Sequence, residues 1–443
     1  MNYSLSCSKN TLHVDLRLKG AVEMILVVAT SLVMLAAILS VKFDMISIAV
    51  VMPVAILGIV AMGAGYISLH NGIELSGGGL PPLFMDGSSA EAVGYIFLRD
   101  STAIFLGGAC INFFRNPQKF THPRKNSVLR NSQGFLLLSK SRQGILVGMS
   151  LALEFIFIIG NWRILLFRDT YLIGVPKGSI YGAILYLIPL FSLIGMSLVG
   201  KKTRYSYFLS IIISIGFVIE FACASRNFAI LVAAAGYFIV ARVRKIETKI
   251  FAWVVIVVST AFSLYLVIQF RNLTHHGLIP HLEFLLSNQI FANNFISGLI
   301  GNYFVILPVT YLGLSLLTPP GYLATSISPL LGRNTNWYEI APNLTVENPW
   351  TPSGAVAQVA NLGRLTEFIV WLGLGIVCQI LANSFQRSNK REFYQIFLTA
   401  SILSASLQFL QYSLRAGVRF LYLAIFVSIL SKFFDHDAAK ELI

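Results

Sequence analysis

Apolar residues occur along this chain in long runs, and polar residues are concentrated in the segments between them. A helix that crosses a membrane needs about 20 mostly apolar residues. Eleven runs satisfy this requirement: 21–41, 46–68, 92–113, 144–161, 180–200, 207–223, 227–241, 250–269, 366–383, 394–412 and 418–434. The pattern predicts an all-α polytopic membrane protein, built as a single integral membrane domain over residues 1–443.

One further apolar stretch, 295–317, contains Gly298, Gly301, Pro308 and Gly313. Glycine and proline weaken or interrupt a helix, so this stretch is either a twelfth span or a helix that lies in or re-enters the outer interface. It belongs to the segment 270–365, which is far longer than an ordinary connection between helices. We therefore expect 11 to 12 transmembrane helices and one long periplasmic loop.

Basic residues indicate which side of the membrane is cytoplasmic. Lys and Arg gather in four connections, 114–143, 201–204, 242–249 and 387–391. Threading the helices in order places all four on one side, together with the tail from Lys432, and the positive-inside rule identifies that side as cytoplasmic. The same count puts the N-terminus outside, although Lys9, Arg17 and Lys19 favour the inside. A different boundary near the start, or one re-entrant segment, would remove this conflict.

Composition agrees with a membrane protein and excludes several other classes. Hydrophobic residues make up 56% of the chain and charged residues only 12%, about half the usual charged content of a soluble protein. This excludes disordered, collagen-like, disulfide-stabilised and purely soluble proteins. The net charge of +14 follows from the cytoplasmic clusters and does not predict a nucleic-acid partner. The four cysteines are widely spaced and read as small apolar side chains.

Arginine is unexpectedly frequent on the outer side. The outer segments contain a single lysine, Lys177, and eight arginines: Arg163, Arg168, Arg226, Arg271, Arg333, Arg364, Arg415 and Arg419. The positive-inside rule does not distinguish Lys from Arg, whereas the planar guanidinium fork binds phosphate through two hydrogen bonds. The bias predicts a cationic cavity for an anionic, lipid-borne ligand. Each arginine could instead be a snorkelling anchor or the partner of an acidic residue, and for Arg99-Asp100 we expect ordinary pairing with neighbours.

The long outer segment also contains residues suited to sugar chemistry. Its aromatic and amide side chains, such as Trp337 and Asn343, can stack on sugar rings and bind hydroxyl groups. His275, His276 and His281 follow Arg271 closely and could supply a base near neutral pH. They could equally be exposed loop histidines, an interpretation that the sequence favours for His281. No nucleotide-binding loop, metalloprotease motif or nucleophile elbow is present. The sequence therefore predicts neither a cofactor nor a metal.

Three stretches resemble the bacterial O-antigen and oligosaccharide repeat-unit polymerases, the Wzy family. Leu80–Phe84 looks like an early periplasmic turn of the family, and Ser225-Arg226-Asn227 looks like its Ser-Arg turn. Residues 351–375, TPSGAVAQVANLGRLTEFIVWLGLG, look like the end of its long periplasmic loop. The spacing from Arg226 to Gly236 is one residue shorter than the Arg–Gly pattern of some members.

The resemblance implies a metal-independent membrane glycosyltransferase with a GT-C-like fold, multi-pass in the bacterial inner membrane. Its substrates would be undecaprenyl-diphosphate-linked glycans, and its partners membrane lipid and a chain-length regulator protein. A hydroxyl group of one repeat unit would attack the anomeric carbon of the lipid-linked chain. We expect Arg226 and Arg271 to bind diphosphate, Arg163, Arg364, Arg415 and Arg419 to support them, and His275 or His276 to act as the base.

Two other functions require a similar cationic cavity. A flippase for lipid-linked oligosaccharides is the main alternative that is not an enzyme, although such transporters commonly have two similar halves, which are absent from this sequence. An O-antigen ligase is the nearest enzymatic alternative, because it shares the fold type and differs in its acceptor. The sequence favours the polymerase and leaves both alternatives open.

Overall fold

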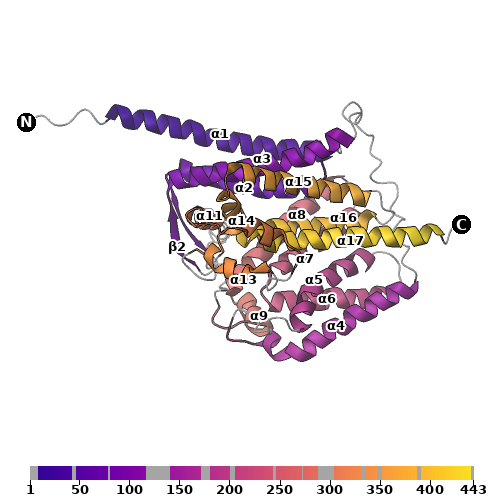
Figure 1. Cartoon of the computed structure of the whole chain (residues 1–443). Coiled ribbons are helices and arrows are strands. Elements are labelled where there is room, and N and C mark those ends of the chain that lie inside the picture. The colour runs from indigo at the N-terminus through magenta and orange to yellow at the C-terminus, as the bar shows by residue number, and fades with distance from the viewer. Residues whose placement is uncertain are drawn as a thin grey trace, which may run out of the picture. The chain divides into compact units, whose positions relative to one another are not determined.

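The computed structural model of the chain describes most of its residues. The described ranges are 8–41, 46–77, 80–115, 140–170, 180–199, 205–242, 246–271, 273–287, 304–330, 335–346, 352–386 and 391–440. Within them the chain is mostly helical (Figure 1).

Each of the eleven predicted apolar segments coincides with a helix. The helices are α1 (Ser8–Val41), α2 (Ile48–Leu69), α3 (Gly87–Arg115), α4 (Lys140–Leu166), α5 (Ile180–Val199), α6 (Ser206–Ala222), α7 (Arg226–Arg242), α8 (Ile246–Arg271), α15 (Arg364–Gln386), α16 (Arg391–Gln411) and α17 (Leu414–Lys440). Five of these helices, α1, α2, α3, α4 and α15, contain a stretch long and apolar enough to cross a membrane. The prediction of a helical membrane protein is therefore confirmed, whereas the number of spans and their sidedness stay predictions.

One small sheet was not predicted. Strands β1 (Ile73–Gly77) and β2 (Leu80–Met85) pair between α2 and α3. After β2, Asp86 accepts hydrogen bonds from the Ser88 hydroxyl at 2.5 Å and the Ser89 amide at 2.9 Å. These bonds hold the pKa of Asp86 well below its usual range and cap the first turn of α3.

The described part of the stretch 295–317 contains a helix too short to span a membrane. Helix α11 (Ile306–Gly313) has eight residues, which is about 12 Å at 1.5 Å per residue, against a hydrocarbon core of about 30 Å. Residues 295–303 lie outside the described ranges.

The chain forms two compact units. The first comprises Met1–Leu75, Pro82–Ser132 and Phe304–Ile443, and the second comprises Ser76–Pro81 and Gln133–Tyr303. That they act as a single membrane domain stays a prediction.

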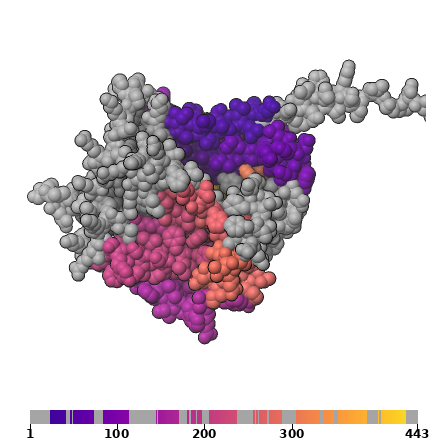
Figure 2. Space-filling model, turned by 180° about the vertical axis from the view of Figure 1, so that it is seen from behind, coloured from indigo at the N-terminus to yellow at the C-terminus, as the bar shows by residue number. Residues whose placement is uncertain are grey.

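The first unit is built around the pairing of α3 with α15. Helices α1, α2 and α3 lie side by side, and Figure 2 shows the indigo surface of α1 directly against the violet surface of its neighbours. Short elements from the long predicted loop cover the ends of α15, α16 and α17: α11, α12 (Tyr322–Ile327), α13 (Trp337–Ile340), a 3-10 turn (Ala341–Leu344) and α14 (Gly354–Ala360). These are the ends that the sequence assigns to the outer side.

Glycines allow α3 and α15 to approach closely. A Cβ atom on Gly107 would lie 2.1 Å from the Leu372 carbonyl oxygen, and one on Gly375 would lie 2.1 Å from the Ile104 carbonyl oxygen. Only glycine fits at both positions, and small residues are the usual means by which helices approach one another in membranes. The crossing therefore brings the outer turns of the two helices together.

Amide groups join the opposite half of the same helices. Gln379 accepts a hydrogen bond from the Ser47 amide at 2.9 Å and donates to Asn383 at 3.0 Å. Asn383 in turn donates to Asn112 at 3.0 Å. This chain of hydrogen bonds ties α15 to α3 and to the start of α2, and it satisfies polar groups where water is scarce.

The second unit packs α4 to α9 around two clusters of buried apolar side chains. One cluster contains Phe157, Ile188 and Ile219, and the other contains Phe221 and Phe270. Helix α9 (Leu278–Leu286) closes this unit against α4 and α6. It follows a turn at Gly277, where φ is +118° and a Cβ atom would lie 2.6 Å from the Leu166 carbonyl oxygen.

Candidate functional site

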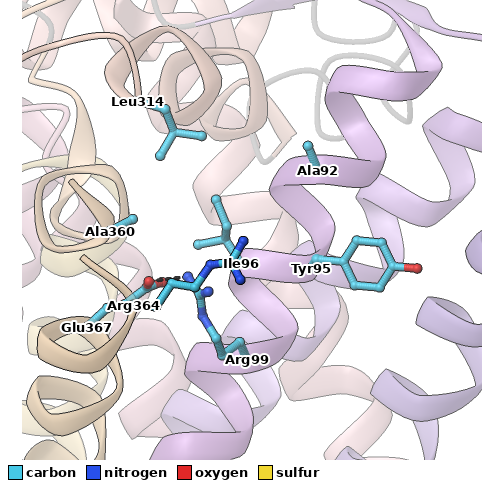
Figure 3. Close-up of a pocket in the computed structure, with 8 residues that line it drawn as sticks. All are labelled: Ala92, Tyr95, Ile96, Arg99, Leu314, Ala360, Arg364 and Glu367. Carbon is cyan, nitrogen blue, oxygen red and sulfur yellow. Dashed lines mark hydrogen bonds and ion pairs between the residues drawn. The ribbon is translucent and has the colours of Figure 1, made fainter. Parts of the chain in front are cut away.

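A pocket of about 510 Å³ opens between α3 and α15 in the first unit (Figure 3). Its lining combines two arginines, a glutamate and a tyrosine with small and apolar residues. The lining residues are Ala92, Tyr95, Ile96, Arg99, Leu314, Ala360, Arg364 and Glu367. The pocket is the best candidate for a ligand site among the described residues, because it brings charged groups together inside a membrane-spanning helix pair.

Helical spacing places the polar side chains on facing surfaces. Tyr95 and Arg99 are four residues apart on α3, and Arg364 and Glu367 are three residues apart at the start of α15. Residues at these spacings share one face of a helix. The two faces therefore meet across the pocket.

The turn before α15 is fixed by hydrogen bonds to the end of α11. The Asn361 amide donates to the Gly313 carbonyl at 3.0 Å and to the Leu316 carbonyl at 2.6 Å. Gly363 then adopts a φ of +98°, a conformation that favours glycine. Together these features set the position of Arg364, the first residue of α15.

Glu367 and Arg99 form an ion pair across the pocket wall. Arg99 Nη2 donates to Glu367 Oε2, and the side chain of Glu367 is fully buried while that of Arg99 is 33% exposed. The fully buried Asp100 is hydrogen-bonded to the same Glu367 carboxyl group. The Glu367 carboxyl group is therefore engaged by both Arg99 and Asp100.

Arg364 is the more accessible cation of the pocket. Its side chain is exposed and makes no ion pair with any described residue. Figure 3 shows it extending from α15 toward α3, beside the Arg99–Glu367 pair. A guanidinium group in this position can bind a phosphate group through two parallel hydrogen bonds.

A wider groove of about 900 Å³ lies on the other side of the same turn. It is lined by residues 318–324 and 327–329, by Leu362 and Thr366, and by Tyr422 of α17. Most of these side chains are apolar or aromatic. Because Arg364 and Glu367 face the pocket while Leu362 and Thr366 face the groove, the first turn of α15 separates a charged site from an apolar one.

The two predicted arginines of α17 differ in their surroundings. Arg415 is 2% exposed, donates to the carbonyl oxygens of Thr325 and Leu330, and lies 5.4 Å from the centre of the Trp337 ring. Its contacts therefore hold α12 and α13 onto α17. Arg419 is exposed, and neither arginine lines the pocket or the groove.

The predicted histidines lie in the second unit. His276 forms an isolated antiparallel bridge with Arg168, and their backbone hydrogen bonds measure 2.8 Å in both directions. The neighbouring His275 contacts Asp169 at 3.1 Å between Nδ1 and Oδ1. Burial and the nearby Arg168 charge lower the pKa of His276. His275 and His276 are thus brought to the end of α4.

His281 is buried, whereas the sequence predicted an exposed loop residue. Its ring stacks on Phe270 with centres 4.2 Å apart, and Nδ1 lies 3.0 Å from the Phe221 carbonyl oxygen. Burial is the main cause that lowers its pKa to about 4. The buried residues of α9 are Pro280, His281 and Phe284, and their three- to four-residue spacing is typical of one face of a helix.

The remaining predicted arginines of the second unit stand at helix ends. Arg163 is exposed near the end of α4 and lies 5.4 Å from the centre of the Trp162 ring. Arg226 is the first residue of α7 and Arg271 the last of α8, as the apolar runs predicted. Arg168 instead turns inward and donates to the Ala222 carbonyl at 2.9 Å.

Of the predicted binding residues, the pocket contains Arg364 alone. Sequence reasoning missed Arg99 and Glu367, although one signal was present: each is a charged residue inside an apolar segment, one helical turn from a second polar residue. No three His, Cys, Asp or Glu side chains among the described residues come together to hold a metal ion. Comparisons of this chain with protein-family models, with curated proteins and with solved structures find no match.

Proposed function

We propose that this chain is a membrane glycosyltransferase that polymerises undecaprenyl-diphosphate-linked oligosaccharide repeat units into O-antigen or a related surface polysaccharide. The reaction takes place on the periplasmic face of a bacterial inner membrane, in a GT-C-like fold. The observation that carries the proposal is the pocket between α3 and α15, where the exposed fork of Arg364 stands beside the buried Glu367.

The chemistry of the pocket suits a diphosphate leaving group. Transfer of a lipid-linked glycan breaks the bond between the anomeric carbon and a phosphate oxygen, and negative charge develops on the departing diphosphate. Donors that are already oriented toward this charge lower the barrier. Arg364 offers such donors without first having to break an ion pair within the described residues.

The apolar groove supports a ligand attached to a lipid. It begins at Leu362 and Thr366, directly beside the turn that presents Arg364. A polyprenyl chain is entirely apolar, and its diphosphate is doubly anionic or more. One turn of α15 thus separates a surface for each half of such a substrate.

The segment that resembles the polymerase family is the segment that builds the site. Residues 351–375 form α14, the turn at Asn361 and the first half of α15, and they supply Ala360, Arg364 and Glu367 to the pocket. The stretch with the resemblance therefore supplies three of the eight residues that line the pocket.

Deletion of the gene in its own host tests this function through the glycan profile. A polymerase predicts that lipid A cores carry a single repeat unit in place of long chains, and that the full-length gene restores long chains. Wholly uncapped cores would instead indicate a ligase or a flippase, and an unchanged profile would contradict all three functions.

A further inference from the structure

We infer that α9 lies in the membrane interface, with one apolar face inserted among the lipids that surround the end of α4. The partner of this face is the lipid surface, and the contact keeps the turn before α9 at the level of the lipid headgroups. The inference concerns the second unit alone and does not depend on the proposed function.

Helix α9 has two apolar faces, and only one of them packs against protein. Its buried residues are Pro280, His281 and Phe284. On the opposite side of the helix, Ile279, Leu282 and Leu286 are 45%, 44% and 86% exposed. Positions i, i+3 and i+7 share one face of a helix, so these three side chains form a continuous apolar strip.

The height of α9 relative to the membrane follows from α4. Residues Val147–Leu166 of α4 form a stretch long and apolar enough to cross a membrane. Helix α9 begins where this stretch ends: a Cβ atom on Gly277 would lie 2.6 Å from the Leu166 carbonyl oxygen, and His276 pairs with Arg168. Figure 1 shows α9 beside this end of α4. The apolar strip therefore stands at the level where the span ends.

The exposed surface of α4 marks the membrane boundary. Phe155, Ile159 and Trp162 are 50%, 73% and 51% exposed, and their spacing places them on one face. This face ends at Trp162 and Arg163, which are residue types of the membrane interface. Leu166 lies about 6 Å beyond Trp162 along the helix axis, and each interfacial layer is roughly 5–8 Å thick. Helix α9 thus begins inside that layer.

The polar residues around the strip fit the interface better than the bilayer centre. Glu283 is exposed at the edge of the strip, and Thr274 and His275 are exposed in the turn before α9. Charged groups are costly at the bilayer centre, whereas a helix with an apolar face and polar neighbours is stable in the interface. At nine residues, or about 14 Å, α9 is too short to cross the membrane.

Spin labels measure the depth of individual side chains in proteoliposomes of the purified full-length chain, with the native cysteines replaced by serine. Labels on Leu282→Cys and Leu286→Cys should collide more often with O₂, which dissolves in lipid, than with a water-soluble nickel complex. Ile159→Cys on α4 is the lipid-facing reference and Thr274→Cys the water-facing one. The ratio of O₂ to nickel collision rates on α9 should exceed the ratio at Thr274 several-fold. Equal ratios at these three positions would overturn the inference.

Nanodiscs that each hold one copy of the chain distinguish lipid from a second copy as the partner of the strip. If lipid covers the strip, the labels on Leu282→Cys and Leu286→Cys stay protected from the nickel complex in these discs. Protection that appears only in proteoliposomes, where copies can meet, would identify a second copy as the partner and would contradict the contact with lipid.

Leu286→Trp gives a second measurement, because this side chain is exposed and its replacement leaves the buried face of α9 unchanged. The added fluorescence, relative to the wild type, should be quenched more by phospholipids brominated near the carboxyl end of the acyl chain than by those brominated near its methyl end. Stronger quenching near the methyl end would place α9 in the bilayer core. No added quenching would place the strip in water, and either result would contradict an interfacial helix.

Discussion

Arginine side chains on the outer segments of this protein differ in what their guanidinium groups already bind. Arg415 donates to the carbonyl oxygens of Thr325 and Leu330, and Arg168 donates to the carbonyl oxygen of Ala222. Arg364 makes no ion pair with a described residue and faces a pocket. The number of arginines on one side of a membrane protein is therefore a weaker guide to a phosphate site than the partners that each one has.

Substitution of Arg364 by lysine tests whether the fork geometry matters. Lys keeps the positive charge and loses the paired donors, and a hydrogen bond to a charged group is worth roughly 1.5–3 kcal/mol. We expect Arg364→Lys to slow polymerisation by about ten- to a hundredfold, nearly as much as Arg364→Ala, with normal protein levels. The measurement is the rate at which long-chain polymer forms.

The same comparison applies to Arg226 and Arg271, which the sequence selected. Arg204→Lys, in a connection predicted to be cytoplasmic, is the control and should leave the rate unchanged. Normal rates in the lysine variants of all three outer arginines would identify them as membrane anchors.

His281 predicts a dependence of stability on pH. Its pKa falls from the ordinary value of 6.5 to about 4 in the folded protein, chiefly through burial. Between these values the unfolded chain binds more protons than the folded one, so this contribution is complete above about pH 6.5 and is lost as the pH falls toward 4. Each such proton changes the free energy of unfolding by at most about 1.4 kcal/mol per pH unit.

Thermal unfolding in detergent at pH 7 and pH 5 measures this effect. The unfolding temperature of the wild type should fall at the lower pH, and His281→Phe, which can still stack on Phe270, should show a smaller fall. His70→Phe is the matched control at an exposed position. An identical pH dependence of wild type and His281→Phe would contradict the prediction.

At the scale of the elements, the crossing of α3 and α15 determines whether the pocket forms. Gly375 and Gly107 each face a backbone carbonyl of the other helix at a distance that excludes a Cβ atom. Gly373, two residues away on α15, has no neighbour within 4 Å of an added Cβ. The same helix thus contains a glycine required by packing and one that is not.

Gly375→Ala should force the two helices apart and lower stability by about 1–3 kcal/mol, the usual cost of overpacking. Gly373→Ala should be neutral or slightly stabilising, because Ala favours a helix by up to about 1 kcal/mol over Gly. Comparison of their unfolding temperatures in the same detergent checks this. Equal stabilities would mean that the crossing is looser than the structure indicates.

Apolar runs predicted the helices well, because a helix that faces lipid must be apolar over most of its length. The runs did not reveal the pocket, since it depends on which helices pair, and Arg99 and Glu367 are 268 residues apart. The turn that presents Arg364 is likewise set by the contacts of Asn361 with α11, which no local pattern encodes. The exposed loop expected at His281 was wrong, because α9 has only nine residues and lies within a segment whose length is typical of a loop.

For the molecule as a whole, the sidedness predicted from the basic clusters stays a prediction. In the first unit, the ends assigned to the outer side lie together under α11, α12 and α14. A reporter that is active only in the periplasm should therefore be active when fused at Gly277 or Asn343 and inactive when fused at Asn131 or Asn389. Cytoplasmic signal at Asn343 would place the pocket on the wrong side for lipid-linked glycans.

The Arg99–Glu367 pair also affects how the protein is made. Helix α3 leaves the ribosome early, yet the partner of its arginine is encoded 268 residues later. At about 5–20 residues per second, roughly 15–50 s pass before α15 emerges. During this time α3 carries an arginine and an aspartate that each cost about 2.5–3.5 kcal/mol near the centre of a lipid-exposed helix. We therefore expect α3 to be retained by the insertion machinery, or shielded by α1 and α2, until α15 is synthesised, so that the order of membrane integration departs from the order of translation.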